Sequence, residues 1–153
     1  MPIKTPQSIK VEHDELHAQL ARAKDAGGDT GDAAEAVAKL LAPHFLKEEE
    51  YALPPLGLLP PLAEGRVLPE MEAAVAMSYR LKADLGHMLL EHEQIVIALK
   101  ALIEAANAEG KADAAHFAEK LMLHAQTEEE VLYPTSILVG EYLNLKLSEK
   151  IGR

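Results

Sequence analysis

The sequence predicts an all-α protein, an antiparallel up-and-down four-helix bundle followed by a short fifth helix at the C-terminus. Ala, Leu, Glu and Lys dominate and β-branched residues are scarce, which favours helix almost everywhere. Apolar residues recur at spacings of three and four in four long segments. Gly and Pro interrupt this pattern at Gly27-Gly28, at Pro54 to Pro61, at Gly110 and at Pro134, and the connections suit antiparallel neighbours.

The five expected helices cover residues 7–25, 32–51, 69–106, 113–133 and 135–147. Pro43 lies inside the second and should kink it, because proline removes one hydrogen-bond donor. Pro69 suits the first turn of the third helix, whose length leaves a break near Gly86 open. We expect one domain over residues 1–153, with the bundle at about 8–134. The tail at 135–153 either covers the bundle or pairs with a second subunit in a homodimer.

Composition excludes several classes of function. The 153 residues include 25 acidic and 15 basic side chains, for a net charge of -10, which argues against a nucleic-acid partner. The absence of cysteine excludes disulfides, thiolate metal sites, iron–sulfur clusters and cysteine nucleophiles. No apolar run resembles a signal peptide or reaches the length of a membrane helix. The expected location is therefore cytoplasmic, with no membrane contact.

An internal repeat carries the chemical information. Glu12-His13 recurs 79 residues later as Glu91-His92. The pattern H-x3-E-E-E-x3-P begins at His44 and recurs 80 residues later at His124. The chain therefore consists of two helix pairs, each with one lone histidine and one His-x3-Glu motif.

Helix geometry gives the His-x3-Glu spacing a meaning. Residues four apart lie on one helix face, so His44 with Glu48, and His124 with Glu128, each present a nitrogen and a carboxylate to the same volume. With His13 and His92, they make four imidazoles and two carboxylates. This set favours iron, zinc, copper or manganese over calcium or magnesium, and two facing carboxylates favour a dinuclear centre. One such motif alone is usually a solvated pair, but two in register are harder to explain without a metal.

These motifs resemble the hemerythrin-like, or HHE cation-binding, family over roughly residues 8–134. The resemblance implies a non-haem centre of two iron ions, bridged by oxo or hydroxo, inside a four-helix bundle. It implies that His13, His44, His92 and His124 are terminal ligands and that Glu48 and Glu128 are bridging carboxylates.

The resemblance also raises the question of a seventh ligand. Oxygen-carrying members of the family have a fifth histidine four residues after the histidine of the third helix, where this chain has Val96. His17 lies four residues after His13, at the pseudo-symmetric position, and we expect it to complete the set. The alternative is a surface histidine beside Asp14, which would leave one iron with an additional open position.

The remaining candidates have ordinary alternatives. His87 and His116 lie outside the repeat and are expected to be plain bundle or surface histidines. Glu12 and Glu91 either orient nearby imidazoles or are solvated. Tyr51 and Tyr133 lie one turn beyond the predicted bridging carboxylates, and each is either a hydrogen-bond donor to the site or an aromatic at the end of the bundle.

Two classes of function remain. As a binding protein, the chain would hold O2 or NO reversibly for storage, delivery or sensing. As an enzyme, it would decompose peroxide or oxidise iron, which needs an open iron position. No histidine follows a glutamate by three residues, which argues against the ferritin-like di-iron fold. A metal-free scaffold would require six repeat-related ligands to be coincidental.

Overall fold

The computed structural model describes residues 2–150 as a succession of helices with no strand among them; residues 151–153 of the expected tail lie outside the described residues. The all-α prediction is confirmed. The elements in chain order are α1 (Gln7–Asp25), α2 (Gly28–Lys47), a π-helix (Glu48–Ala52), a 3-10 helix (Pro54–Leu58), α3 (Leu59–Ala63), a 3-10 helix (Pro69–Met71), α4 (Glu72–Ala108), α5 (Ala112–Thr127), a π-helix (Glu128–Leu132) and α6 (Tyr133–Lys150). Within residues 2–150, the helices lack the combination of length and apolarity that a bilayer crossing requires.

The chain divides into two compact units. The first comprises residues 8–45 and 87–127 and includes all seven histidines, so we call it the histidine unit. The second comprises residues 2–7, 46–86 and 128–150 of the described chain and includes Glu48 and Glu128, so we call it the carboxylate unit. Helix α4 contributes its first half to the carboxylate unit and its second half to the histidine unit. The single domain over 1–153 stays a prediction.

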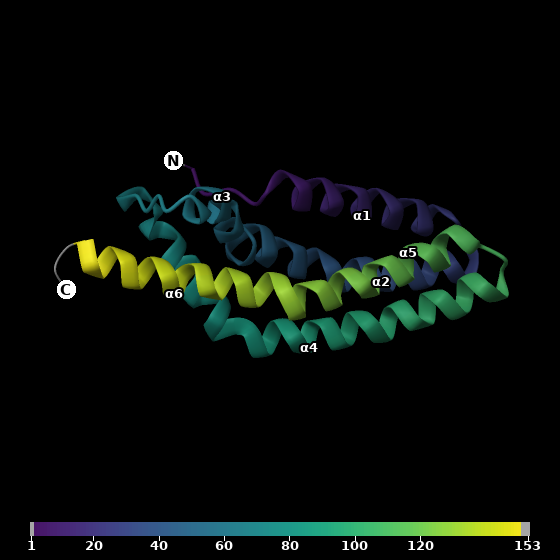
Figure 1. Ribbon diagram of the computed structural model, residues 1–153. Helices are drawn as coiled ribbons and strands as arrows, with labels where there is room; N and C mark the ends of the chain where they lie inside the picture. Colours follow the sequence, from purple (N-terminus) through teal and green to yellow (C-terminus); the bar gives the residue numbers. More distant parts are fainter. Residues whose placement is uncertain (1, 151–153) are drawn as a thin grey trace. The chain divides into compact units, whose positions relative to one another are not determined.

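Four helical segments of alternating direction form the histidine unit: α1, α2, the second half of α4, and α5 (Figure 1). Each contributes large apolar side chains to one core, for example Leu16 from α1, Phe45 from α2, Leu99 from α4 and Leu121 from α5. These side chains are at most 4% exposed. Burying each is worth about 1.5–3 kcal/mol, so the apolar faces read from the sequence hold the four segments together.

Hydrogen bonds from polar side chains stabilise the turns at one end of the histidine unit. The Glu109 carboxylate accepts hydrogen bonds from the Thr30 backbone N–H at 2.8 Å and the Thr30 hydroxyl at 2.5 Å, and so caps the start of α2. These bonds lower the pKa of Glu109 to about 2. Lys111 Nζ donates to the Ala26 carbonyl at 2.6 Å, next to the end of α1. Gly110 has a φ of 69°, the left-handed conformation that lets Lys111 N–H close the end of α4.

The carboxylate unit is built around α6, α3 and the start of α4. Its core includes Leu58, Met71, Val139 and Leu143, all at most 4% exposed. The Leu- and Pro-rich connection before α3 is mostly buried, as its apolar composition requires. Gly140 of α6 admits the side chain of Ser78, since a β-carbon at this glycine would collide with it.

The helix bounds differ from the sequence expectation at the start of α2 and at α6, and the break near Gly86 that the sequence left open does not occur. Helix α2 begins at Gly28 rather than near residue 32, because Glu109, a residue distant in sequence, satisfies its first backbone donors. Helix α4 is continuous through Gly86. Pro134 does not end the helix, since the π-helix at Glu128–Leu132 leads directly into α6, and the fifth helix is accordingly longer than 135–147.

Candidate metal centre

Each His-x3-Glu motif straddles a change in helix type. His44 lies in α2 and Glu48 begins the following π-helix; His124 lies in α5 and Glu128 begins the second π-helix. In the first of these, the Leu53 N–H reaches back five residues to the Glu48 carbonyl at 2.9 Å. Single π-turns inside α-helices occur frequently at functional sites. Here both of them begin at a predicted bridging carboxylate.

The four repeat-related histidines form two facing pairs in the histidine unit. His44 Nε2 lies 2.9 Å from His92 Nε2, and His13 Nε2 lies 3.1 Å from His124 Nε2. All four residues are at most 6% exposed. Two nitrogens bound side by side to one ion at about 2.0–2.1 Å are separated by about 3.0 Å when the angle at the metal is near 90°. Each pair therefore has the spacing of two ligands of a single ion.

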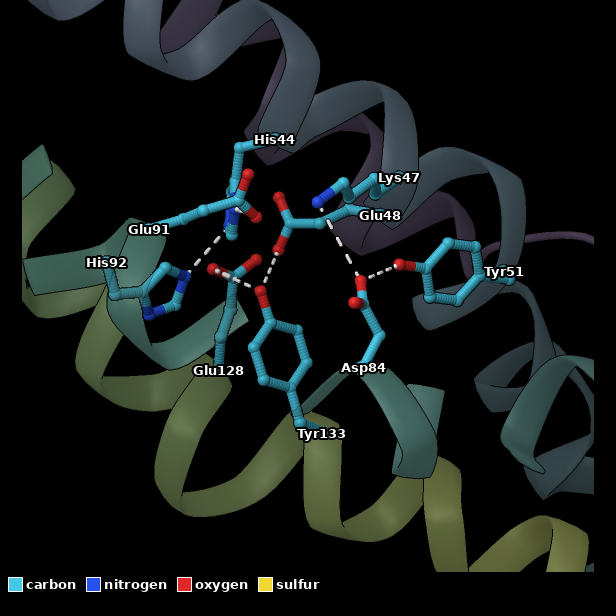
Figure 2. Close-up of polar contacts among 9 residues, drawn as sticks. All are labelled: His44, Lys47, Glu48, Tyr51, Asp84, Glu91, His92, Glu128 and Tyr133. Carbon is cyan, nitrogen blue, oxygen red and sulfur yellow. Dashed lines mark hydrogen bonds and ion pairs between the residues drawn. The ribbon is translucent and has the colours of Figure 1, made fainter. Parts of the chain in front are cut away.

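A carboxylate fixes one imidazole of each pair. Glu91 Oε1 lies 3.2 Å from His44 Nδ1, and Glu12 Oε1 lies 2.5 Å from His124 Nδ1. When Nδ1 donates its proton to the carboxylate, the lone pair on Nε2 is left for a metal. The interpretation of Glu12 and Glu91 as residues that orient imidazoles is confirmed, and Figure 2 shows Glu91 beside His44.

The two predicted bridging carboxylates share a tyrosine in the carboxylate unit. The Tyr133 hydroxyl donates to Glu48 Oε2 at 2.7 Å and lies 3.4 Å from Glu128 Oε1 (Figure 2). All three residues are at most 1% exposed. Burial, followed by the neighbouring charge of Glu128, raises the pKa of Glu48 well above its ordinary value. Burial also raises the pKa of Tyr133, which keeps its hydroxyl a proton donor.

Tyr51 has a different partner. Its hydroxyl donates to Asp84 Oδ2 at 2.6 Å, Lys47 Nζ lies 3.7 Å from the same oxygen, and the Arg80 guanidinium lies over the Tyr51 ring. Of the two tyrosines singled out in the sequence, Tyr133 therefore contacts the carboxylates, whereas Tyr51 is bonded to Asp84. The repeat contains the signal for this difference, because the residue before the proline is Tyr133 in one copy and leucine in the other.

Among the described residues, two groups of buried histidines and glutamates could hold a metal ion. One group contains His44, Glu48, His92 and Glu128, and the other contains His13, His124 and Glu128. Imidazole nitrogens with carboxylate oxygens are a donor set that suits iron, zinc or manganese, so the residues present fit a transition metal.

The other predicted positions lie outside these groups. His17 is exposed and its ring packs edge-on against Phe45, with the ring centroids 4.6 Å apart. His17 as a ligand stays a prediction. His87 and His116 are exposed, as expected for histidines outside the repeat.

Comparison with known proteins returns one family. The hemerythrin HHE cation-binding domain matches residues 5–136, which is most of the chain. No curated protein and no solved structure matches the chain significantly.

Proposed function

Because the chain belongs to the hemerythrin HHE cation-binding domain family, we propose that it is a non-haem di-iron protein that binds O2 or NO. Iron and the diatomic ligand are both part of the proposal. The observation that supports it is the pair of buried Nε2–Nε2 contacts, at 2.9 and 3.1 Å, each of which would offer two nitrogen ligands to one ion.

The proposed ligands follow from these two histidine pairs. His44 and His92 would hold one ion, and His13 and His124 the other. Glu128 would bridge them, because it belongs to both groups of side chains that could hold a metal. Glu48 would be the second bridge, by its equivalent place in the repeat.

The chain's own residues would orient the metal ligands and exclude water from the site. Glu91 and Glu12 hold the imidazole rings through Nδ1, and the Tyr133 hydroxyl holds one oxygen of Glu48. Phe45 packs against the ring of His13, with 4.9 Å between ring centroids, and helps to keep water from that histidine. When bound, two ferrous ions supply the redox chemistry that reversible O2 binding requires.

The exposed position of the His17 ring, packed against Phe45, favours a second candidate function. If its imidazole stays against Phe45, one iron keeps an additional open position, and that position suits peroxide decomposition or iron oxidation. If the imidazole turns inward on metal binding, it completes the set of five histidines and two carboxylates. Reversible binding of O2 is then the expected activity.

The test is metal content and the visible spectrum of the protein, reconstituted with ferrous iron without air and then exposed to air. We expect about two irons per chain and an absorption band that appears in air and disappears under vacuum. Irreversible oxidation of two irons would support the enzyme instead. A His116→Ala control should keep both irons, since the His116 side chain is 79% exposed. Failure to retain any transition metal would refute the site.

A further inference from the structure

Helix α6 carries more apolar surface than the carboxylate unit buries. One face of α6 packs inward through Val139 and Leu143. A second face presents Leu138, 64% exposed, Tyr142, 39% exposed, and Leu145, 65% exposed. Surface helices usually expose polar residues opposite a single apolar face, so this second face calls for an explanation.

The exposed residues have the spacing of a helix-pairing seam. Thr135, Leu138, Tyr142 and Leu145 follow one another at intervals of three, four and three, the a and d positions of a heptad. We call these four residues the α6 stripe. Because the stripe rises only about 15 Å along the helix at 1.5 Å per residue, any pairing through it is weak and depends on concentration.

An apolar groove runs beside the stripe. It has a volume of about 320 Å³ and lies between stripe residues and Leu59, Leu62 and Ala63. Leu138 is one of the residues that line it. A twofold axis between two copies would bring each Leu138 to the groove of the other copy, as in the knobs-into-holes packing of paired helices.

Two charged residues flank the stripe. Glu141 precedes Tyr142 and Lys146 follows Leu145, and their side chains are 41% and 43% exposed. In the heptad set by the stripe, Glu141 occupies position g and Lys146 occupies the next position e. In a parallel pair these positions face each other across the seam, so Glu141 of each copy meets Lys146 of the other copy.

We infer that the α6 stripe is a self-association surface through which two copies of this chain pair with their α6 helices parallel. The stripe spacing, the adjoining groove and the Glu141–Lys146 complementarity carry this inference. It does not depend on the metal centre, since all of these residues belong to the carboxylate unit and none is a proposed ligand.

The first test is sedimentation equilibrium of the full chain from micromolar to millimolar concentration. We expect a reversible monomer–dimer equilibrium that Leu138→Lys abolishes. The control is Ile97→Lys, since Ile97 is also 64% exposed but lies on α4. Both variants replace exposed residues and should keep the wild-type circular dichroism. A wild-type chain that stays monomeric throughout, or equal effects of the two variants, would overturn the inference.

A charge exchange tests the parallel arrangement. Glu141→Lys and Lys146→Glu should each weaken dimerisation roughly tenfold, because each turns two attractive contacts per dimer into repulsive ones. An equimolar mixture of the two variants should restore it, because both contacts in the mixed dimer are attractive again. The mixture also controls for loss of the Lys82–Glu141 ion pair at 3.3 Å within one chain. Failure of the mixture to recover would rule out the parallel pairing.

Discussion

Replacing Tyr133 with Phe tests whether the hydroxyl shared by the two carboxylates contributes to metal binding. The substitution removes one buried oxygen and its hydrogen bond to Glu48 at 2.7 Å, and keeps the ring. A hydrogen bond to a charged group is worth about 1.5–3 kcal/mol, and one between neutral groups about 0.5–1.5 kcal/mol. In the metal-free protein the raised pKa of Glu48 favours its neutral form, whereas a metal requires the carboxylate.

Only the difference between these two bonds appears in the metal affinity. That difference is about 1–1.5 kcal/mol, which corresponds to a roughly tenfold loss. The assay is anaerobic calorimetric titration of the metal-free protein with ferrous iron. We expect Tyr133→Phe to bind about tenfold more weakly, with the stoichiometry still near two.

Tyr51→Phe is the matched control. Tyr51 is 2% exposed against 0% for Tyr133, and its hydroxyl makes an equally short bond, at 2.6 Å, but to Asp84. It should lower the thermal stability of the metal-free protein without changing iron affinity by more than about twofold, which corresponds to about 0.4 kcal/mol. Equal losses of affinity in the two variants, or none in Tyr133→Phe, would refute the role given to this hydroxyl.

Three further predictions concern pH, the turns and the seventh ligand. The folded pKa of Glu48 is raised, so the metal-free protein should lose stability as the pH rises above about 4.5, the ordinary pKa of this group. In denaturant titrations, Glu48→Gln should reduce this dependence of stability on pH. An unchanged dependence would contradict the reasoning. Glu109→Gln should lower the melting temperature at neutral pH. Because the folded pKa of Glu109 is lowered to about 2, the difference in melting temperature between wild type and variant should disappear as the pH falls from about 4.5 through 2. A variant as stable as wild type at neutral pH would show that the carboxylate does not stabilise α2. His17→Ala should keep two irons but convert reversible oxygenation into irreversible oxidation, as followed by the visible band, and an unchanged band would remove His17 from the ligand set.

Local sequence pattern predicted the helices well, and the six repeat-related residues that it singled out as ligands are all buried, although their role as ligands stays a prediction. The bounds of α1 were predicted to the residue, because apolar spacing and the Gly27-Gly28 break act locally. The interaction that sets the start of α2 could not be read in this way, since Glu109 lies 79 residues after Thr30. The π-turns at Glu48 and Glu128 likewise leave no signal in periodicity, because one inserted residue per turn differs little from an ordinary α-helix over so short a span.

The direction in which individual side chains point could not be predicted from the sequence. The repeat places Tyr51 and Tyr133 at different positions, but only the structure shows that the Tyr133 hydroxyl bonds to Glu48 and the Tyr51 hydroxyl to Asp84. His17 stays open for the same reason, since one turn of helix brings it near His13 but its exposed ring packs against Phe45. Iron, the diatomic ligand and the cytoplasmic location stay predictions.

The pairing of the imidazoles has a consequence for the origin of the repeat. Glu12 and His13 come from the first half of the chain and contact His124 from the second half, while Glu91 and His92 of the second half contact His44 of the first. In these contacts the His-x3-Glu histidine of each half is oriented by a glutamate of the other half. A half-length ancestor with these motifs would therefore have had to form a homodimer to assemble either of the proposed metal sites in this way. Gene duplication and fusion would have made that association permanent.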